Sequence, residues 1–408
     1  MRIALITARN PLATAADRSD QPVYLARALA SQGHRVTLYA RRDGTSTPEA
    51  VLGRGVAIEH VPAGPAKELT PEQAAKYMPD FAAYLIGRWK TNRPDIVHAF
   101  TWVGGLAALG AVRGTDIPVV QTFGSLALAE SRHDHGSVRA SRMRLETLIG
   151  RQANAVVASS TQEAGDLARL SVPRPSVRII PAGVDTDVFT PVGKQASRSS
   201  RVRLVAIASS EQAAGLQAVV RATAQVPGAE LVIVGGPDNR HLPRSGPYSE
   251  LAQLASGLRI RSRVKFAGEM SSAKLAALLR SADVLVSAAA YEPSGIAAIQ
   301  AMACGTPVIA SAVGAHSDAV IDGTTGLLVA PDHASMLAHR LRRLLSTPAL
   351  LSAYGIAAAD RAQSRYSWDR IARETAATYE RCLPSRAVAD ADEAATAEEE
   401  LGLFAVTG

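Results

Sequence analysis

Residues 282–311 read ADVLVSAAAYEPSGIAAIQAMACGTPVIAS, in which two aliphatic runs flank one helix-like segment. A Pro-Ser-Gly turn follows Glu292, and residues 296–303 lack Gly and Pro and carry apolar residues at helical spacing. The stretch therefore predicts a strand, a tight turn, a helix and a second strand. The first N–H groups of that helix have no partner within the helix and would suit an anion such as phosphate, with Glu292 at the rim.

The same alternation of aliphatic strands and helix-like segments runs through most of the chain. In the first half, we expect strands at 2–7, 34–40, 56–61, 94–100, 117–123, 153–159 and 177–182, and helices at 23–32, 71–91, 103–112 and 138–151. In the second half, we expect strands at 201–209, 229–236, 263–269, 282–288, 306–311 and 326–331, and helices at 215–226, 248–258, 272–281, 295–303 and 333–346. This alternation predicts an α/β fold of two Rossmann-like domains, each a doubly wound parallel sheet.

A polar, interrupted segment separates the two halves. Residues 185–200 contain Pro, Gly and a Ser/Arg cluster, which is typical of an interdomain linker. We expect a first domain over 1–184, a second over 201–365 and a final helix over 366–384, whereas the acidic residues 385–408 are predicted to be a mobile tail. Ligands of doubly wound sheets bind at the carboxyl ends of the strands, so the two domains would face each other across a cleft.

The composition of the 408 residues, 47% hydrophobic and 20% charged, is that of a globular protein. No run approaches the ~18 apolar residues of a membrane span, and the opening RIALIT is too short for a signal peptide, so we expect a cytoplasmic protein. The net charge of +7 comes from Arg spread along the chain without interleaved aromatics, and no nucleic-acid partner is expected. Cys304 and Cys382 lie far apart, which indicates neither a disulfide nor a zinc site.

Several motifs together resemble the retaining glycosyltransferases of family 4. They are RALASQGHRVTLYA (27–40), RPDIVHAF (93–100), IIPAGVDTDVFTP (179–191), residues 282–311 and DGTTGLLVAP (322–331). The resemblance implies the GT-B fold, with SWDRIARETAATYERCL (367–383) as the helix that returns to the first domain. It also implies transfer of a sugar from a nucleotide-diphosphate sugar to an acceptor hydroxyl, with no cofactor. The Asp185 and Asp187 pair has DxD spacing but lies in the linker motif, so no metal site is expected.

The donor half of the resemblance carries over residue by residue. Glu292 matches the first Glu of the family's Glu-x7-Glu pair, which contacts sugar hydroxyls, and would be the catalytic residue. Gln300 stands at the second position, where an amide can still hydrogen-bond the ribose of the nucleotide. The backbone N–H groups of Ser294, Gly295 and Ile296 match the anion-binding turn.

The expected cations for the diphosphate are replaced. The family places an Arg and a Lys in a segment that here reads ASSEQAAG (208–215), with Ser209 and Ala214 at those positions. Charge-assisted hydrogen bonds contribute ~1.5–3 kcal/mol each, so the loss of both would weaken donor binding or rate by about two to four decades. Arg240, in the loop after the strand at 229–236, could substitute for them, although such a loop is more often simply solvated.

The acceptor half is predicted from residues that follow the strands of the first domain. His98 and Trp102 could contact a sugar acceptor, but core packing is an equal alternative for His98. Gly124 stands where the family commonly has a His that meets the donor sugar. A basic cluster comprises Arg132, His133, His135, Arg139, Arg142 and Arg144. It would suit an anionic acceptor or peripheral membrane contact, and an ordinary exposed helix face is the alternative.

A second function class remains open. Ser209, Ala214, Gln300 and Gly124 together depart from the family pattern at both halves of the site. The chain could therefore be a non-catalytic GT-B protein that binds a glycan or nucleotide, or that assists an active partner glycosyltransferase. Binding of nucleotide-diphosphate sugars would discriminate between the two classes.

Overall fold

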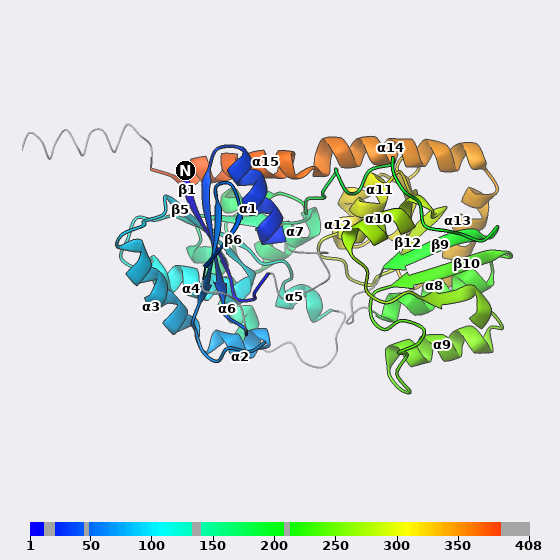
Figure 1. The fold of residues 1–408 in the computed structure, drawn as a ribbon, viewed down its shortest axis with the longest axis horizontal. Helices are drawn as coiled ribbons and strands as arrows, with labels where there is room; N and C mark the ends of the chain where they lie inside the picture. The colour runs from blue at the N-terminus through cyan, green and yellow to red at the C-terminus, as the bar shows by residue number, and fades with distance from the viewer. Residues whose placement is uncertain (12–20, 45–48, 133–139, 208–212, 385–408) are drawn as a thin grey trace, which may run out of the picture.

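The fold is described from a computed structural model, for residues 1–11, 21–44, 49–132, 140–207 and 213–384. Two sheets with their helices form two domains that lie next to each other along the longest axis of the molecule (Figure 1). The predicted α/β fold of two doubly wound parallel sheets is confirmed.

The described residues of the first domain form eight strands in the order β3-β4-β2-β1-β5-β6-β7-β8. These are β1 (Arg2–Thr7), β2 (Arg35–Arg41), β3 (Glu49–Gly53), β4 (Val56–Val61), β5 (Ile96–Phe100), β6 (Val119–Thr122), β7 (Ala155–Ala158) and β8 (Val177–Ile179). Its helices are α1 (Gln21–Ser31), α2 (Pro71–Ala75), α3 (Met78–Trp89), α4 (Thr101–Ala111), α5 (Ala127–Glu130), α6 (Ala140–Gln152) and α7 (Thr161–Arg169). All strand pairs are parallel except β3 with β4, an antiparallel edge that the sequence analysis did not predict.

In the second domain, the part of the chain that the structure describes forms six parallel strands in the order β11-β10-β9-β12-β13-β14. These are β9 (Val202–Ile207), β10 (Ala229–Val234), β11 (Val264–Phe266), β12 (Val284–Ser287), β13 (Val308–Ser311) and β14 (Gly326–Val329). Its helices are α8 (Ala213–Ala224), α9 (Pro247–Gly257), α10 (Ser272–Arg280), α11 (Ile296–Ala303), α12 (Gly314–Ala319), α13 (Ala334–Leu345) and α14 (Pro348–Tyr366). Short 3-10 turns lie at Arg174–Ser176 and Arg261–Arg263.

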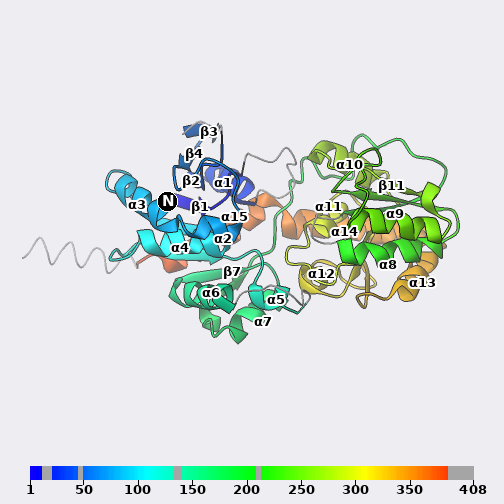
Figure 2. The ribbon, with the colours of Figure 1, turned by 90° about the horizontal axis from the view of Figure 1, so that it is seen from below.

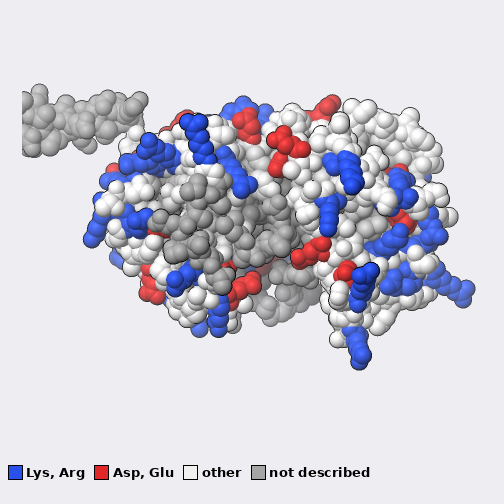
Figure 3. All heavy atoms as spheres, viewed as in Figure 1, with Lys and Arg blue, Asp and Glu red and all other residues white. Residues whose placement is uncertain are grey.

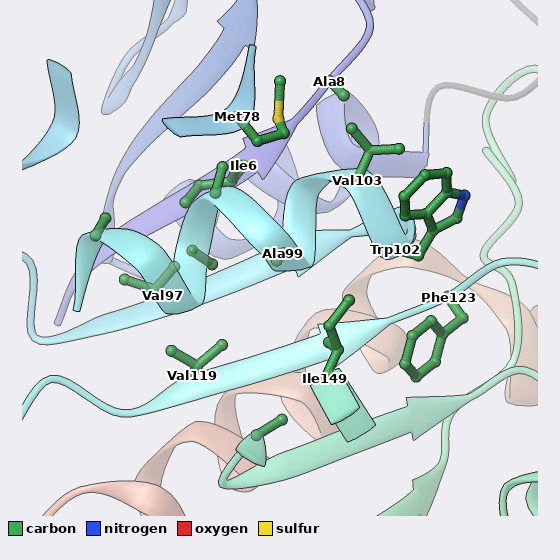
Figure 4. Packing of buried hydrophobic residues seen from close by; sticks show 14 of the residues in the cluster. Ile6, Ala8, Met78, Val97, Ala99, Trp102, Val103, Val119, Phe123 and Ile149 are labelled. Carbon is green, nitrogen blue, oxygen red and sulfur yellow. The ribbon is translucent and has the colours of Figure 1, made fainter. Parts of the chain in front are cut away.

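Alternating side chains of β1 divide between two hydrophobic clusters, which shows that both faces of the first sheet are covered. Ala4 and Ile6 belong to one cluster, and Ile3 and Leu5 belong to the other. In the first cluster, Ile6, Val97 and Val119 from adjacent strands pack under helix α4 (Figure 4). The near-continuous aliphatic strands read from the sequence are a direct consequence of this double burial.

The last helix, α15 (Trp368–Cys382), leaves the second domain and packs on the first. Helices α14 and α15 run in succession along one side of both domains (Figure 1). Tyr379 and Ile371 belong to the first domain's second cluster, and the Trp368 ring stacks on Tyr24 with 5.6 Å between centroids. The Val184 N–H donates to the Tyr366 carbonyl at 2.8 Å, so the two chain crossings between the domains lie side by side.

The structure corrects the predicted elements in several places. The single helix expected over 71–91 is two helices, because Pro79 lacks the N–H that a continuous helix would need. Helices α5, α7, α12 and α14 were not predicted at all. Every helix in the described part of the chain is too short or too polar to traverse a bilayer. The predicted mobile tail lies outside the described residues.

Candidate functional site

The turn before α11 lies where the two domains meet. The hydroxyl of Ser159, which follows β7 of the first domain, donates to the Pro293 carbonyl at 2.6 Å. The Gln162 side-chain oxygen accepts from the Gly314 N–H at 2.7 Å. Tyr291 packs against the first domain's core cluster, and α12 faces α5 and α7 of the first domain (Figure 2). The Glu292 turn is therefore part of the domain junction.

The Glu292 carboxylate closes its own turn. Its Oε1 accepts hydrogen bonds from the Gly295 N–H at 2.9 Å and from both the N–H and the hydroxyl of Ser294 at 3.2 Å. The Ile296 N–H is directed at the Ser294 hydroxyl at 3.4 Å. The three N–H groups expected to bind an anion thus each have a partner inside the turn, and Glu292 is 7% exposed.

Two glycines allow the loops before α11 and α12 to approach closely. Gly314 has φ of +51°, and a Cβ there would lie 2.0 Å from the Glu292 carbonyl oxygen. That oxygen accepts the Ala315 N–H at 2.9 Å. Gly295 caps α11 with φ of +66° and would place a Cβ 3.2 Å from the Ala315 Cβ. The sequence motif predicted a turn here, and these contacts show why glycine is required at both positions.

His316, on the first turn of α12, was not predicted as a site residue. It is fully buried behind Glu292, and its Nε2 lies 3.9 Å from Glu292 Oε2, beyond hydrogen-bond distance. Burial lowers the pKa of His316, against the opposing effect of the Glu292 carboxylate, so the ring is neutral near pH 7. A single His after a strand carries no motif, and only the fold brings it to Glu292.

The other residues predicted to bind the sugar donor are not all brought to the Glu292 turn. Gln300 lies on α11 one turn beyond Ile296, on the same helix face, and is 5% exposed. Ser209 lies outside the described residues, and Ala214 falls in the first turn of α8.

Arg240 is exposed in the loop after β10. Its N–H donates to the Asp238 carboxylate at 2.9 Å, and Asp238 also accepts from the His241 ring at 2.7 Å. Among the described contacts, none brings the Arg240 guanidinium to the Glu292 turn. Its part in donor binding stays a prediction.

A cavity of about 280 Å³ lies at the carboxyl ends of the first domain's strands. The ends of β1, β5, β6 and β7 contribute to its wall, together with the starts of α1 and α15. Its lining includes His98, Thr122, Gly124, Ser159 and Trp368. Ser294 contributes from the second domain, so the cavity opens on the Glu292 turn. This position is the one expected for a ligand of a doubly wound sheet.

His98 borders this cavity but is itself 2% exposed. Its Nδ1 lies 2.7 Å from the Tyr379 hydroxyl and its Nε2 lies 2.8 Å from the Thr122 hydroxyl. Burial lowers the pKa of His98 to about 3, so the ring is neutral. The Nδ1 contact holds α15 in place and the Nε2 contact holds β6 in place. His98 therefore packs in the core and also forms part of the cavity wall.

The structure does not bring Trp102 to the cavity. Its ring lies in the core cluster beside Val103 and Phe123 (Figure 4). Thr101, with φ of +62°, lines the cavity instead, because α4 starts there and turns its second residue inward. Gly124 does line the cavity, and its φ of +76° explains the glycine.

Two members of the predicted basic cluster, Arg132 and Arg142, pair with acids of the first domain. Arg132 donates to both carboxylate oxygens of Asp166 at 2.7 and 3.1 Å. Arg142 donates to Glu130 and to the buried Glu146. Residues 133–139 lie outside the described residues. On the face shown in Figure 3, Lys and Arg are spread over both domains with acids among them.

The Asp185 and Asp187 pair has a structural role. The Asp185 carboxylate accepts the N–H groups of Asp187 at 3.1 Å and Val188 at 3.2 Å, which closes a turn. Within the described ranges, no group of three His, Cys, Asp or Glu side chains is placed to hold a metal.

Two Rossmann-like domains, a returning terminal helix and a cavity at the facing strand ends define the GT-B glycosyltransferase fold. Residues 23–188 match the model Glycosyltransferase Family 4, and residues 193–361 match the model Glycosyl transferases group 1. The D-inositol 3-phosphate glycosyltransferase of Streptomyces scabiei is 32% identical over 385 residues, which cover 88% of this chain and 84% of that one. The chain belongs to this family of glycosyltransferases.

Solved structures show the same fold. A sucrose-phosphate synthase from Thermosynechococcus elongatus is 27% identical with a TM-score of 0.83, over 93% of this chain and 98% of that one. HepE from Anabaena, solved in complex with UDP-glucose, has a TM-score of 0.72 at 18% identity, over 93% of this chain and 99% of that one.

Proposed function

We propose that the chain transfers a sugar from a nucleotide-diphosphate sugar to an acceptor hydroxyl, with retention of the anomeric configuration. The observation that carries the proposal is that Ser294, from the turn before α11, lines the same cavity as Thr122 and Gly124 of the first domain. A donor held at the start of α11 would face an acceptor in the cavity. Relatives named as glycosyltransferases, and a UDP-glucose complex of the same fold, support this use.

The roles of the residues follow from their positions. Glu292 would orient the donor sugar, the N–H groups of Ser294, Gly295 and Ile296 would hold phosphate oxygens, and Gln300 would hold the ribose. The leaving phosphate can accept the acceptor proton on the same face, so the proposal needs neither a dedicated base, a metal nor a cofactor. The protein would contribute positioning and stabilisation of the leaving charge.

A non-catalytic GT-B module is the second candidate. It is favoured by the Glu292 carboxylate, which occupies the N–H groups that a donor phosphate would need. The absence of cations at Ser209 and Ala214 favours it as well. Such a module would bind nucleotide or glycan without turnover, alone or beside an active partner glycosyltransferase.

Calorimetric titration with UDP-glucose, ADP-glucose, GDP-mannose and UDP-N-acetylglucosamine tests the proposal. We expect one of them to bind below millimolar concentration and to release its nucleoside diphosphate when sugar or polyol acceptors are added. Product anomers are then assigned by NMR. Glu292→Gln should lower turnover at least tenfold, whereas the control Glu250→Gln, exposed on α9, should not. Binding without release would favour the module, and no binding at millimolar donor would overturn donor use altogether.

A further inference from the structure

The Glu292 carboxylate and a donor phosphate would compete for the same hydrogen-bond donors. Oε1 takes the N–H groups of Ser294 and Gly295, at 3.2 and 2.9 Å, at the start of α11. Each N–H donates one good hydrogen bond, so a phosphate oxygen can bind here only after the carboxylate leaves. A displaced carboxylate that stays buried needs a new donor, because an unpaired buried charge is strongly unfavourable.

His316 is the neighbouring group that can supply this donor. Its Nε2 lies 3.9 Å from Oε2, the Glu292 oxygen that makes no hydrogen bond within the turn. The ring is fully buried, and neither nitrogen has a partner of hydrogen-bond geometry among the described residues, although the Ser311 carbonyl lies near it. A shift of the carboxylate by ~1 Å would bring the pair to hydrogen-bond distance.

We propose that His316 is a positioning residue for Glu292: it receives the carboxylate when an anionic ligand displaces it from the Ser294 and Gly295 N–H groups. The Glu292 carboxylate thus has two positions. In one it blocks the anion site, and in the other it leaves the site open. The inference rests on the proposed use of this turn for the donor diphosphate.

The fold holds the two groups at this separation. Gly314 and Ala315 fix the backbone of α12 against the Glu292 carbonyl, so His316 cannot move away from the turn. A neutral imidazole has one N–H to donate, and burial keeps His316 in that form. Only the Glu292 side chain has to rotate.

The test uses full-length protein and calorimetric binding of UDP, ADP, GDP and inorganic pyrophosphate, which lack the sugar that Glu292 would contact. Glu292→Ala should tighten binding of the preferred anion about fivefold or more, because the competitor is gone. His316→Phe should weaken it about tenfold, since the displaced carboxylate then has no partner. His316→Gln keeps a donor near the Nε2 position and should restore affinity to within about threefold of the unchanged protein.

The double variant Glu292→Ala with His316→Phe separates positioning from folding. If His316 acts through the carboxylate, His316→Phe has no effect on anion affinity once Glu292 is absent. Equal weakening in both backgrounds would show a merely structural role and overturn the proposal. Thermal unfolding of each variant identifies any that fail to fold. Glu250→Gln, which removes an exposed carboxylate on α9, should leave affinity within about twofold.

The two proposals fail separately. No nucleotide-sugar binding by the unchanged protein would overturn the proposed transferase, yet pyrophosphate binding that is tighter in Glu292→Ala and weaker in His316→Phe than in the unchanged protein would still support the displaced-carboxylate inference. Anion binding that weakens in Glu292→Ala, or no anion binding by any variant, would overturn the inference.

Discussion

Asp318 of the second domain accepts two hydrogen bonds from Thr161, the first residue of helix α7 in the first domain, beside the N-cap Ser160. Its carboxylate accepts the Thr161 N–H at 2.6 Å and the Thr161 hydroxyl at 2.9 Å. A negative group is favourable at a helix N-terminus because the unpaired N–H groups and the helix dipole both face it. The contact therefore holds the two domains together and also stabilises the N-terminus of α7.

Asp318→Ala should loosen the domain contact. Loss of the two charge-assisted hydrogen bonds to Thr161 should lower the free energy of unfolding by ~0.5–2 kcal/mol, measured with urea. Small-angle scattering should show a larger radius of gyration, because Thr161 no longer holds the second domain. Asp360→Ala, exposed on α14, is the control and should change neither quantity. An unchanged radius of gyration for Asp318→Ala would show that the other contacts suffice.

Gly314→Ala should destabilise the turn more than an ordinary glycine replacement does. The added Cβ would meet the Glu292 carbonyl at 2.0 Å, in addition to the strain at φ of +51°. We expect a loss of at least ~2 kcal/mol in urea unfolding. Gly323→Ala separates the two effects, since Gly323 has φ of +74° but open space around its Cβ position, and it should cost about 1 kcal/mol. Equal losses would contradict the close approach.

Because of His98, the free energy of unfolding should decrease as the pH falls below 6.5. Burial lowers its folded pKa to about 3 from an unfolded value of 6.5, so its contribution is complete above pH 6.5 and is lost as the pH falls. Between pH 6.5 and pH 5, the free energy of unfolding should fall by ~2 kcal/mol, because each pH unit contributes about 1.36 kcal/mol. His98→Asn should be less stable at pH 7.5 but should show a flatter dependence over this range. The same slope in both proteins would contradict a buried, neutral His98.

Arg203 and Lys265 share the buried Glu230 but differ in exposure. Arg203 is 5% exposed at 2.8 Å from Glu230, whereas Lys265 is 49% exposed at 3.0 Å. Arg203→Met should lower the free energy of unfolding by ~3–5 kcal/mol, because it leaves a buried charge poorly compensated. Lys265→Met should cost ~1 kcal/mol or less, since water screens an exposed pair. Urea unfolding of both variants checks the difference, and a loss for Arg203→Met as small as that for Lys265→Met would show that Lys265 alone can compensate Glu230.

Much of the fold could be predicted because local sequence patterns indicate most of its strands and helices. The aliphatic runs marked thirteen of the fourteen strands, since strands buried on both faces must be apolar. The strand β3 (Glu49–Gly53) was missed because an edge strand needs only one partner and carries no such run. Helices α7 and α12 were missed because both are short and carry almost no large apolar residue, and they contact each other across the domain junction.

The candidate site divides in the same way. The sequence could mark the Pro-Ser-Gly turn with Glu292 at its rim, because the turn depends on local backbone conformation, whereas Gly124 was marked through the family resemblance. It could not place His316 beside Glu292, or show that Trp102 is turned into the core and Thr101 toward the cavity. Those arrangements depend on which helix face meets which neighbour.

The sequence by itself determined two doubly wound sheets, the turn before α11 and membership of a glycosyltransferase family. Only the tertiary structure decided that the Glu292 carboxylate fills the turn that was expected to bind an anion, with the buried His316 behind it. The physical reason is the distance along the chain over which each interaction acts. Periodicity and turn residues act between near neighbours along the chain, whereas the Glu292–His316 pair exists because Gly314 lets two separate loops approach to contact distance.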